Sequence, residues 1–376
     1  MEAKNIQGKN IGDIKSSFSK ATEDGFNPTL AITFCSIMQN RKELAHFFKE
    51  KDIDVFGSTT AGEIIDSEIL EQSIVVMLLD IKKAYFKLFF SESQDTYKLA
   101  SKMAHVAKES FANPAIIVVS SGLTIDAEDI INGVHEFDSS LPLFGGLAGD
   151  DLTMKASYVF NSEDETSTGL LALILDTEHI NISGLATSGW DNIGVEKTIT
   201  KSDGNIVYTI DDEPAVDVFV KFFQFPESVY DRSEIIAMNF AQYPLQMKKE
   251  NGNTVLRAPM MADVENRSMI FAGGIPEGSK VKFSVPPGFD LIDKTRDTFN
   301  VLKETMNNPD AVIIFSCKAR HLALGPIMED EAVKIRSIWN KPLIGLFTYG
   351  EIGTANDSIC DFHNETCSLV LLEEKK

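Results

Sequence analysis

The sequence predicts an α/β protein made of two domains of repeated βα units, with mixed sheets flanked by helices. Three observations support this class. A short glycine-rich phrase occurs three times, an apolar run of strand length precedes each copy, and a second apolar run follows it. Each unit is therefore predicted to run strand, helix, strand, loop, strand.

The three copies of the phrase each begin with glycine and end with a glycine followed by an acidic residue. They read Gly57-Ser58-Thr59-Thr60-Ala61-Gly62-Glu63, Gly145-Gly146-Leu147-Ala148-Gly149-Asp150 and Gly345-Leu346-Phe347-Thr348-Tyr349-Gly350-Glu351. Glycine and small residues let backbone amides approach a ligand closely, and hydroxyls supply further donors. The phrases therefore predict three ligand-binding loops. The alternative is that the glycines serve only tight turns or bulges.

The apolar runs around each phrase have the length and β-branched content of buried strands. They are Leu30 to Phe34, Ala115 to Val119 and Ala311 to Phe315 before the phrase, and Ser73 to Leu79, Thr168 to Leu175 and Cys367 to Leu372 after it. Helix-like segments such as 42–49 and 331–339 separate the first strand of a unit from its glycine loop. This alternation favours parallel pairing, while the strand after the loop is free to turn back antiparallel.

A domain boundary is predicted near residue 212. Asp212-Glu213-Pro214 places a capping residue and an early proline directly before the apolar segment Ala215 to Phe225, which is typical of a helix start. The predicted domains are therefore residues 29–212 and 213–372.

Charge and targeting signals narrow the classes of partner. The chain has 35 Lys and Arg against 56 Asp and Glu, a formal charge of -21, which repels phosphate backbones and argues against nucleic acid. No secretory signal and no apolar stretch long enough to cross a bilayer are present, so no membrane insertion is expected. Four cysteines in so long a chain fit a reducing compartment, and a cytoplasmic location is predicted.

Several phrases, in order along nearly the whole chain, resemble the FIST family of sensory signal-transduction proteins, which have an N-terminal and a C-terminal FIST domain. Besides the glycine phrases, they are Gly189-Trp190, Ser316-Cys317-x-x-Arg320 and Phe362-His-Asn-Glu-Thr366. The resemblance implies sensing of small molecules, with amino acids proposed. Relatives often carry a fused output module. We see no room for one before Thr29 or after Lys376, so a separate output protein is expected, and the oligomeric state stays open.

The predicted ligand is amino-acid-like or another small anion, and each candidate residue has a chemical role. Arg320 is expected to clamp a carboxylate with two parallel hydrogen bonds, unless it forms a salt bridge to one of the nearby acidic residues instead. The ring of Tyr349 is expected to form a pocket wall. The acids that end the phrases would face an ammonium group, unless they cap backbone amides instead. The candidate ligand-binding residues are Gly57, Ser58, Thr59, Thr60, Gly62, Glu63, Gly145, Gly146, Gly149, Asp150, Cys317, Arg320, Tyr349, Gly350 and Glu351.

No catalytic constellation can be defended from the sequence, so a binding role is expected and not an enzyme. Two alternatives stay open. The first is a haem-based gas sensor, because some FIST relatives resemble such sensors. The second is a cysteine-dependent enzyme, with Cys317 as nucleophile and His321 or His363 as base. Without a C-x-x-C pair, no metal site is expected, and no cofactor other than haem is considered.

Overall fold

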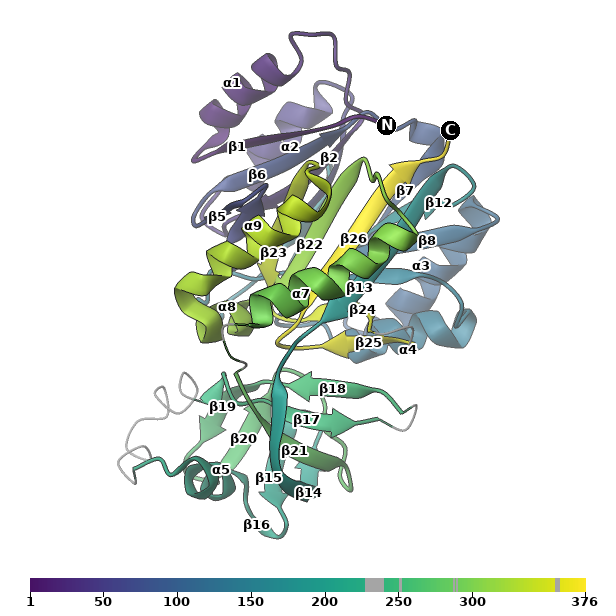
Figure 1. The fold of residues 1–376 in the computed structure, drawn as a ribbon. Helices are drawn as coiled ribbons and strands as arrows, with labels where there is room; N and C mark the ends of the chain where they lie inside the picture. Colours follow the sequence, from purple (N-terminus) through teal and green to yellow (C-terminus); the bar gives the residue numbers. More distant parts are fainter. Residues whose placement is uncertain (227–239, 250–251, 287, 289, 356–358) are drawn as a thin grey trace.

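The computed structural model describes residues 1–226, 240–249, 252–286, 288, 290–355 and 359–376. Figure 1 shows two parts: a larger α/β body that holds both chain termini, and a smaller module made mostly of strands. The body contains three six-stranded sheets of mixed strand direction with helices on their outer faces. The predicted α/β class is therefore confirmed.

The body consists of three repeats with the same order of elements. The first is β1 (Ala3–Gly8), α1 (Ile11–Ala21), β2 (Leu30–Cys35), α2 (Arg41–Lys49), β3 (Asp54–Thr59), the hairpin β4 (Glu63–Ile65) and β5 (Glu68–Leu70), and β6 (Ile74–Leu79). The second is β7 (Phe86–Glu92), α3 (Thr96–Ser110), β8 (Pro114–Ser120), α4 (Ala127–Phe137), β9 (Leu143–Leu147), the hairpin β10 (Val159–Phe160) and β11 (Glu165–Thr166), and β12 (Gly169–Asp176).

The third repeat is interrupted after its first strand. It is β13 (Ile180–Thr187), then the inserted module, then α7 (Leu291–Asn300), β22 (Ala311–Cys317), α8 (Lys318–Leu324), α9 (Met328–Trp339), β23 (Leu343–Thr348), the hairpin β24 (Glu351–Thr354) and β25 (Cys360–His363), and β26 (Cys367–Glu374). Short 3₁₀ turns at Lys83–Tyr85, Val301–Glu304 and Gly325–Ile327 join elements.

Within each repeat, the two strands before the glycine loop pair in parallel, and the last strand returns antiparallel, as the sequence suggested. The parallel pairs are β2 with β3, β8 with β9, and β22 with β23. The returning strands are β6, β12 and β26.

The hairpin after each glycine loop leaves its own sheet and joins the next one. The first hairpin pairs β4 with β23, the second pairs β10 with β3, and the third pairs β24 with β9. The exchange is cyclic, so the three sheets close around a pseudo-threefold axis. The glycine loops are the crossing points of this exchange and therefore must lie together near that axis.

Both faces of the central strands are buried, which explains their uninterrupted apolar sequences. In β2, Ile32 and Phe34 face a core shared by all three sheets, while Ala31 packs under α1 and α2. The outer faces of the other two sheets pack under helices such as α3, α4 and α9. The three sheets therefore share one central core, the first sheet has an outer core of its own, and the outer cores of the other two are continuous.

The inserted module is an antiparallel sheet of β14 (Asp191–Asp203), β15 (Ile206–Ile210), β16 (Glu213–Pro214), β17 (Leu245–Lys248), β18 (Thr254–Arg257), β19 (Pro259–Asp263), β20 (Ser268–Phe271) and β21 (Lys280–Val285), with helix α5 (Ala215–Phe223). An aromatic core around Phe219, Phe240 and Phe283 holds it together. The expected boundary at residues 212 and 213 lies inside this module, in the turn between β15 and β16.

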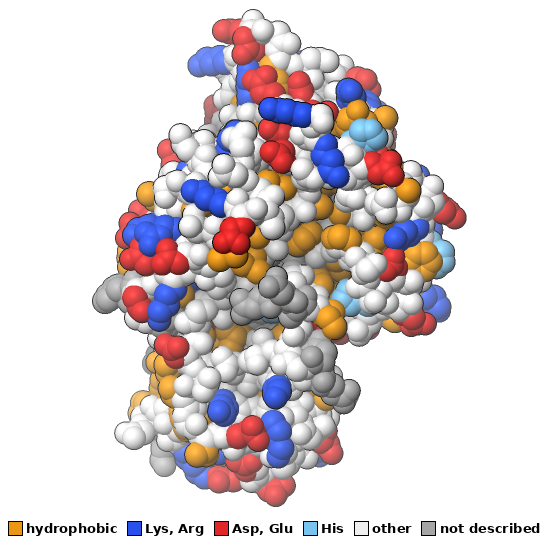
Figure 2. Space-filling view, turned by 45° about the vertical axis from the view of Figure 1, so that its right-hand side comes forward, with side chains coloured by type: hydrophobic (Ala, Val, Ile, Leu, Met, Phe, Trp, Pro, Cys, Tyr) orange, Lys and Arg blue, Asp and Glu red, His pale blue; other side chains and the backbone are white. Residues whose placement is uncertain are grey.

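In Figure 2 the molecule narrows where the module meets the body, and acidic and basic side chains are interspersed over this face. Among the described residues, no helix is both long and apolar enough to cross a membrane.

Candidate functional site

The structure brings the three glycine loops together, as predicted. Each loop donates one backbone N–H to a strand end of a neighbouring sheet. Ala61 donates to Phe347 at 2.9 Å, Gly149 to Thr59 at 3.2 Å, and Tyr349 to Leu147 at 3.0 Å. The three bonds are related by the pseudo-threefold axis. The loop backbones thus bond to one another across the axis.

Close packing explains the glycines. A Cβ atom on Gly145, where φ is +147°, would lie 1.8 Å from the carbonyl oxygen of Val118. A Cβ on Gly149 would lie 2.5 Å from the backbone nitrogen of Ala61, on a neighbouring loop. These positions therefore require glycine for loop-to-loop contact whether or not a ligand is bound.

Two of the three acids at the ends of the phrases occupy equivalent, buried arrangements. Oε1 of Glu63 lies 2.5 Å from the hydroxyl of Thr60, and Oε2 accepts from both the amide and the hydroxyl of Ser73. In the third repeat, Oε1 of Glu351 lies 2.5 Å from the hydroxyl of Thr348. Burial raises the pKa of Glu63 to about 7 and that of Glu351 to about 8, although hydroxyl donors lower both.

The hydrogen-bond geometry at Glu351 can also accommodate a protonated carboxyl. The hydroxyl of Thr348 lies 3.1 Å from the carbonyl oxygen of Ser316 as well as beside Glu351, but it has one proton. If Thr348 donates that proton to Ser316, the proton between Thr348 and Glu351 must come from the carboxyl. Oε2 of Glu351 accepts from the hydroxyl of Thr366 at 2.6 Å.

Asp150 in the second repeat behaves differently. Burial alone would raise its pKa, but hydrogen bonds from the hydroxyl of Tyr349, from Thr153 and from the backbone amides of Met154 and Lys155 lower it below the usual value. Tyr349 is thereby tied to the second loop, since its hydroxyl also accepts from the amide of Leu152 at 3.0 Å. Asp150 therefore caps its own loop.

Arg320 lies in α8 and is fully buried. Its guanidinium pairs with Glu331, with 2.5 Å between Nη2 and Oε1, and also donates to the hydroxyl of Thr295 at 3.1 Å. Nε donates to Oε2 of Glu331 at 3.3 Å, and Nη1 donates to the carbonyl oxygens of Ser188 and Glu365. All three guanidinium nitrogens thus already have acceptors within the protein.

Cys317, His321 and His363, the residues of the possible cysteine-dependent enzyme, have different surroundings in the structure. The thiol of Cys317 is buried, and burial raises its pKa well above the usual value. The ring of His321 stacks on Phe347 with 4.2 Å between centroids, and His363 lies at the end of β25. Among the described residues, no three His, Cys, Asp or Glu side chains are grouped so as to hold a metal ion.

The other predicted residues are also part of the buried junction. Gly57 packs against the ring of Phe160, and the hydroxyl of Thr59 donates to the carbonyl oxygen of Gly149 at 2.6 Å. The hydroxyl of Ser58 is buried and has no hydrogen-bond partner among the described residues. The predicted residues are thus gathered at one junction or, like Arg320, buried beside it, but none of them lines either of the two cavities described next.

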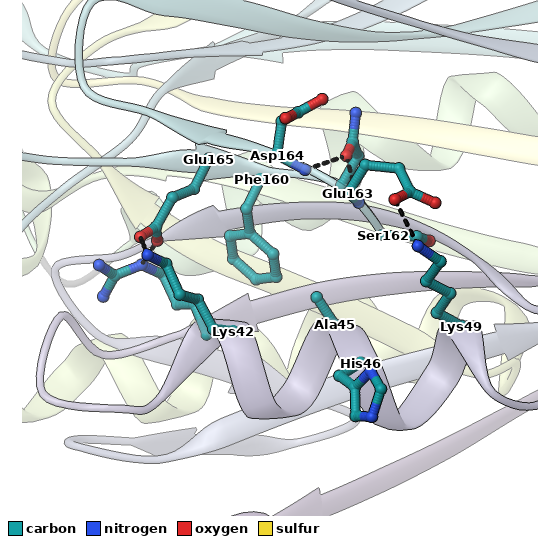
Figure 3. A pocket seen from close by; sticks show the side chains of 11 residues that line it. Lys42, Ala45, His46, Lys49, Phe160, Ser162, Glu163, Asp164 and Glu165 are labelled. Atoms are coloured by element: carbon teal, nitrogen blue, oxygen red, sulfur yellow. Dashed lines mark hydrogen bonds and ion pairs between the residues drawn. The ribbon is translucent and has the colours of Figure 1, made fainter.

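The larger cavity lies on the surface between α2 and the β10–β11 hairpin and has a volume of about 380 Å³ (Figure 3). Basic side chains of the helix face acidic side chains of the hairpin across it. Arg41 pairs with Glu165 at 2.9 Å and Lys49 with Glu163 at 2.5 Å. The charged side chains that line this cavity are largely paired with one another, so we do not favour it as a ligand-binding site.

The second cavity, here called the interdomain cavity, has a volume of about 230 Å³ and lies where the module meets the body. From the body it is lined by Ala186, Thr187, Ser188, Gly189, Ala355, His363 and Thr366, and from the module by Gln246, Thr254 and Leu256. Both the body and the module therefore contribute residues to the lining of the interdomain cavity.

Thr187, Ser188 and Gln246 on this lining are half-buried and Thr254 is exposed, so water reaches these side chains. His363 is the buried polar side chain that differs from them, because its Nε2 atom has a partner and its Nδ1 atom has none in the described part of the chain. His363 is 4% exposed. Buried polar groups are normally hydrogen-bonded, so the Nδ1 atom of His363, together with the polar side chains around it, marks this cavity as the candidate binding site.

Some predicted residues support this cavity from behind. Glu351 accepts from Thr366, which lines it, and Arg320 donates to the carbonyl oxygen of Ser188. The lining residues themselves were not predicted. Two features of the sequence could have pointed to them. One is the polar phrase His363-Asn-Glu-Thr366, which lies between two strands, and the other is Gly189-Trp190, which lies at the start of the insertion.

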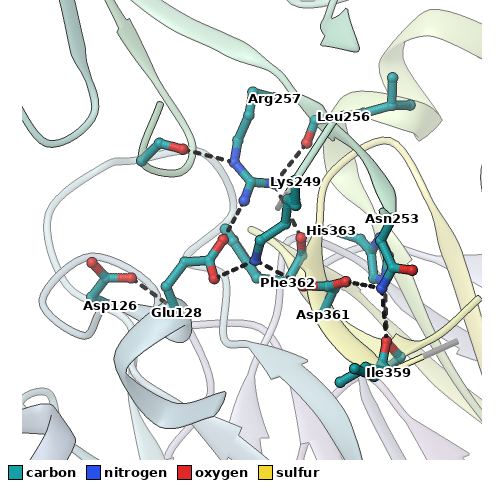
Figure 4. Close-up of polar contacts among 12 residues, drawn as sticks. Asp126, Glu128, Lys249, Asn253, Leu256, Arg257, Ile359, Asp361, Phe362 and His363 are labelled. Atoms are coloured by element: carbon teal, nitrogen blue, oxygen red, sulfur yellow. Dashed lines mark hydrogen bonds and ion pairs between the residues drawn. The ribbon is translucent and has the colours of Figure 1, made fainter. Parts of the chain in front are cut away.

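An ionic network beside the cavity fastens the module to the body (Figure 4). Lys249, from the module, lies 2.9 Å from Glu128 of α4 and 2.7 Å from Asp361 of β25. The buried Arg257 of β18 pairs with Glu128 and donates to the carbonyl oxygen of Phe362 at 3.0 Å. This network sets the position of β17 and β18, the strands that carry the module's cavity residues.

Comparison with known families gives two matches. Residues 29–213 match the model of the FIST N domain, and residues 215–354 match the model of the FIST C domain. A search of curated proteins found no match. The two matched segments are interleaved in the structure, since β4 of the first pairs with β23 of the second.

Proposed function

Because the chain belongs to the FIST family, we propose that it is a sensory protein whose small-molecule ligand binds in the interdomain cavity. FIST domains are associated with sensory and signal-transduction proteins and with small-ligand binding. The observation that carries the proposal is a cavity lined by polar side chains of both the body and the module, among them the buried His363, whose Nδ1 atom has no partner among the described residues. The proposed role is binding and not catalysis.

The position of the cavity supplies a means of signalling. A ligand that contacts Ser188 and His363 on the body and Gln246 on the module favours the arrangement in which the two parts are docked. Binding then shifts the equilibrium between docked and undocked modules. A separate output protein would read that shift, because it changes the exposed surface near the junction.

Thermal unfolding with a panel of small polar molecules, amino acids included, tests the proposal. A ligand at about 100 times its Kd adds about 2.7 kcal/mol of stability, enough to raise Tm by several degrees. The blocking variant is Thr254→Phe, which places a ring in the cavity. Its matched control is Lys248→Phe, since Lys248 is the cross-strand neighbour of Thr254 and does not line the cavity.

We expect at least one compound to raise the Tm of the native protein and of Lys248→Phe but not that of Thr254→Phe. A shift that persists in Thr254→Phe would place the ligand elsewhere. No shift with any member of a broad panel would refute the proposed function.

A further inference from the structure

The chemistry of the lining distinguishes between classes of ligand. Thr187, Ser188 and Thr254 present hydroxyls, and Gln246 presents a carboxamide. Each of these groups can donate and accept hydrogen bonds, so each can pair with a hydroxyl or amide group of either polarity. A molecule with several such groups can satisfy them at the same time.

His363 presents a fixed acceptor. Its Nε2 lies 3.1 Å from the carbonyl oxygen of Gly353, so the proton resides on Nε2 and is donated there. Burial lowers the pKa of His363 to about 4, with the positive charges of Arg257 and Lys249 contributing, so the ring is neutral at pH 7. Nδ1 is then an acceptor without a partner, and the ligand must bring a donor to it.

The described residues that line the cavity carry no formal charge at neutral pH. Behind the lining, the charge of Arg320 is matched by Glu331. Glu365 is buried and its carboxyl has no hydrogen-bond partner in the described part of the chain, and burial raises its pKa well above the usual value, which favours the neutral form. The charges of Lys249 and Arg257 beside the cavity are likewise matched by Glu128 and Asp361. An ion entering the cavity would thus give up part of its hydration without meeting an unmatched counter-charge, which is unfavourable.

From this lining we infer that the interdomain cavity takes an uncharged molecule rich in hydroxyl or amide groups, which donates a hydrogen bond to Nδ1 of His363. The inference rests on the proposed function and specifies its ligand class. It departs from the amino-acid-like anion expected from the sequence, because Arg320, the expected clamp, is already paired with Glu331.

The volume limits the size of this molecule. A water molecule takes up about 30 Å³ of liquid, so a cavity of about 230 Å³ corresponds to roughly seven or eight waters. Pockets for drug-sized ligands begin at about 300 Å³. A short polyol, a small sugar or a small amide matches this range.

Isothermal titration calorimetry with three sets of compounds of similar size tests the class. The uncharged set is erythritol, ribose and nicotinamide, the zwitterionic set is serine and glutamine, and the anionic set is lactate and malate. Each is titrated into the native protein, Thr254→Phe and Lys248→Phe. We expect heat from members of the uncharged set, lost in Thr254→Phe and retained in Lys248→Phe.

Two variants of His363 test its role. In His363→Gln the amide nitrogen can keep the bond to the carbonyl oxygen of Gly353 while the acceptor at the Nδ1 position is lost. In His363→Asn the shorter amide can keep an acceptor near the Nδ1 position. We expect affinity for the uncharged ligand to fall about tenfold in His363→Gln, with the native Tm approximately preserved, and to fall less in His363→Asn.

The outcomes separate the inference from the function on which it rests. If a zwitterion or an anion binds more tightly than every uncharged compound, and this binding is lost in Thr254→Phe, the ligand class is wrong and the site stands. If no compound of any set binds, both the class and the proposed function are refuted. Equal affinity in the native protein and His363→Gln would exclude the role assigned to Nδ1.

Discussion

Replacing Glu351 by glutamine is expected to change how the stability of the protein depends on pH. The carboxyl of Glu351 is fully buried, and its pKa is raised from 4.5 to about 8, mainly by burial. Because the folded state binds this proton more tightly than the unfolded state, stability from Glu351 is fully present below pH 4.5 and is lost as pH rises through 8. Glutamine does not titrate, so this dependence disappears in Glu351→Gln.

The magnitude follows from the two pKa values. Each pH unit between them is worth about 1.4 kcal/mol, and the slope flattens as pH reaches the folded pKa. Between pH 6 and pH 8 the contribution of Glu351 therefore falls by about 2 kcal/mol. Glutamine also leaves one buried N–H without an acceptor, which costs about 1–3 kcal/mol at every pH. The variant is thus less stable than the native protein at pH 6, and the gap narrows by pH 8.

Urea unfolding at pH 6 and pH 8 measures this gap. The matched control is Glu63→Gln, because Glu63 has the equivalent arrangement in the first repeat and a pKa of about 7. Its contribution falls by only about 1 kcal/mol over the same range. His321 and His363, whose pKa values are lowered to about 4, are common to all three proteins and cancel in the comparison. A difference between native protein and Glu351→Gln that does not change with pH would refute the reasoning.

Three further predictions concern stability and reactivity. Glu331→Ala is expected to cost about 3–5 kcal/mol in urea unfolding, because it leaves the buried charge of Arg320 without its partner. Gly145→Ala is expected to cost more than about 4 kcal/mol by the same assay, whereas Gly278→Ala, at positive φ but in open space, costs about 1 kcal/mol. The Cys317 thiol is expected not to react with an aromatic disulfide reagent at pH 7 in the folded protein. Rapid reaction there would favour the cysteine-dependent enzyme.

The sequence predicted the elements with strong local signals. The parallel strand pairs and the returning strands are long, apolar runs buried on both faces, and they were located to within a few residues. The hairpins were missed because their strands are as short as two to four residues, as in β10 and β24, and pair with another repeat. Such pairing leaves no periodic pattern in the local sequence.

The candidate site was harder to predict for a related reason. Thr187, Gln246 and His363 lie far apart in the chain and meet only because the module folds back onto the body. None of the three stands out as a ligand-binding residue from the sequence of its own segment. The repeated glycine phrases gave a much stronger signal, but the structure shows that repetition there follows from the exchange of hairpins between sheets.

The inserted module explains the position of the interdomain cavity in the third repeat. In the first repeat only Lys9 and Asn10 separate the first strand from its helix, and in the second only residues 93–95 do. In the third repeat the whole module fills the corresponding position, between β13 and α7. It covers the turn between β25 and β26, where His363 and Thr366 lie, and so turns an open sheet end into a cavity. The proposed binding site thus lies where the symmetry of the repeats is broken, and substitutions there are expected to alter ligand binding with little effect on the other two repeats.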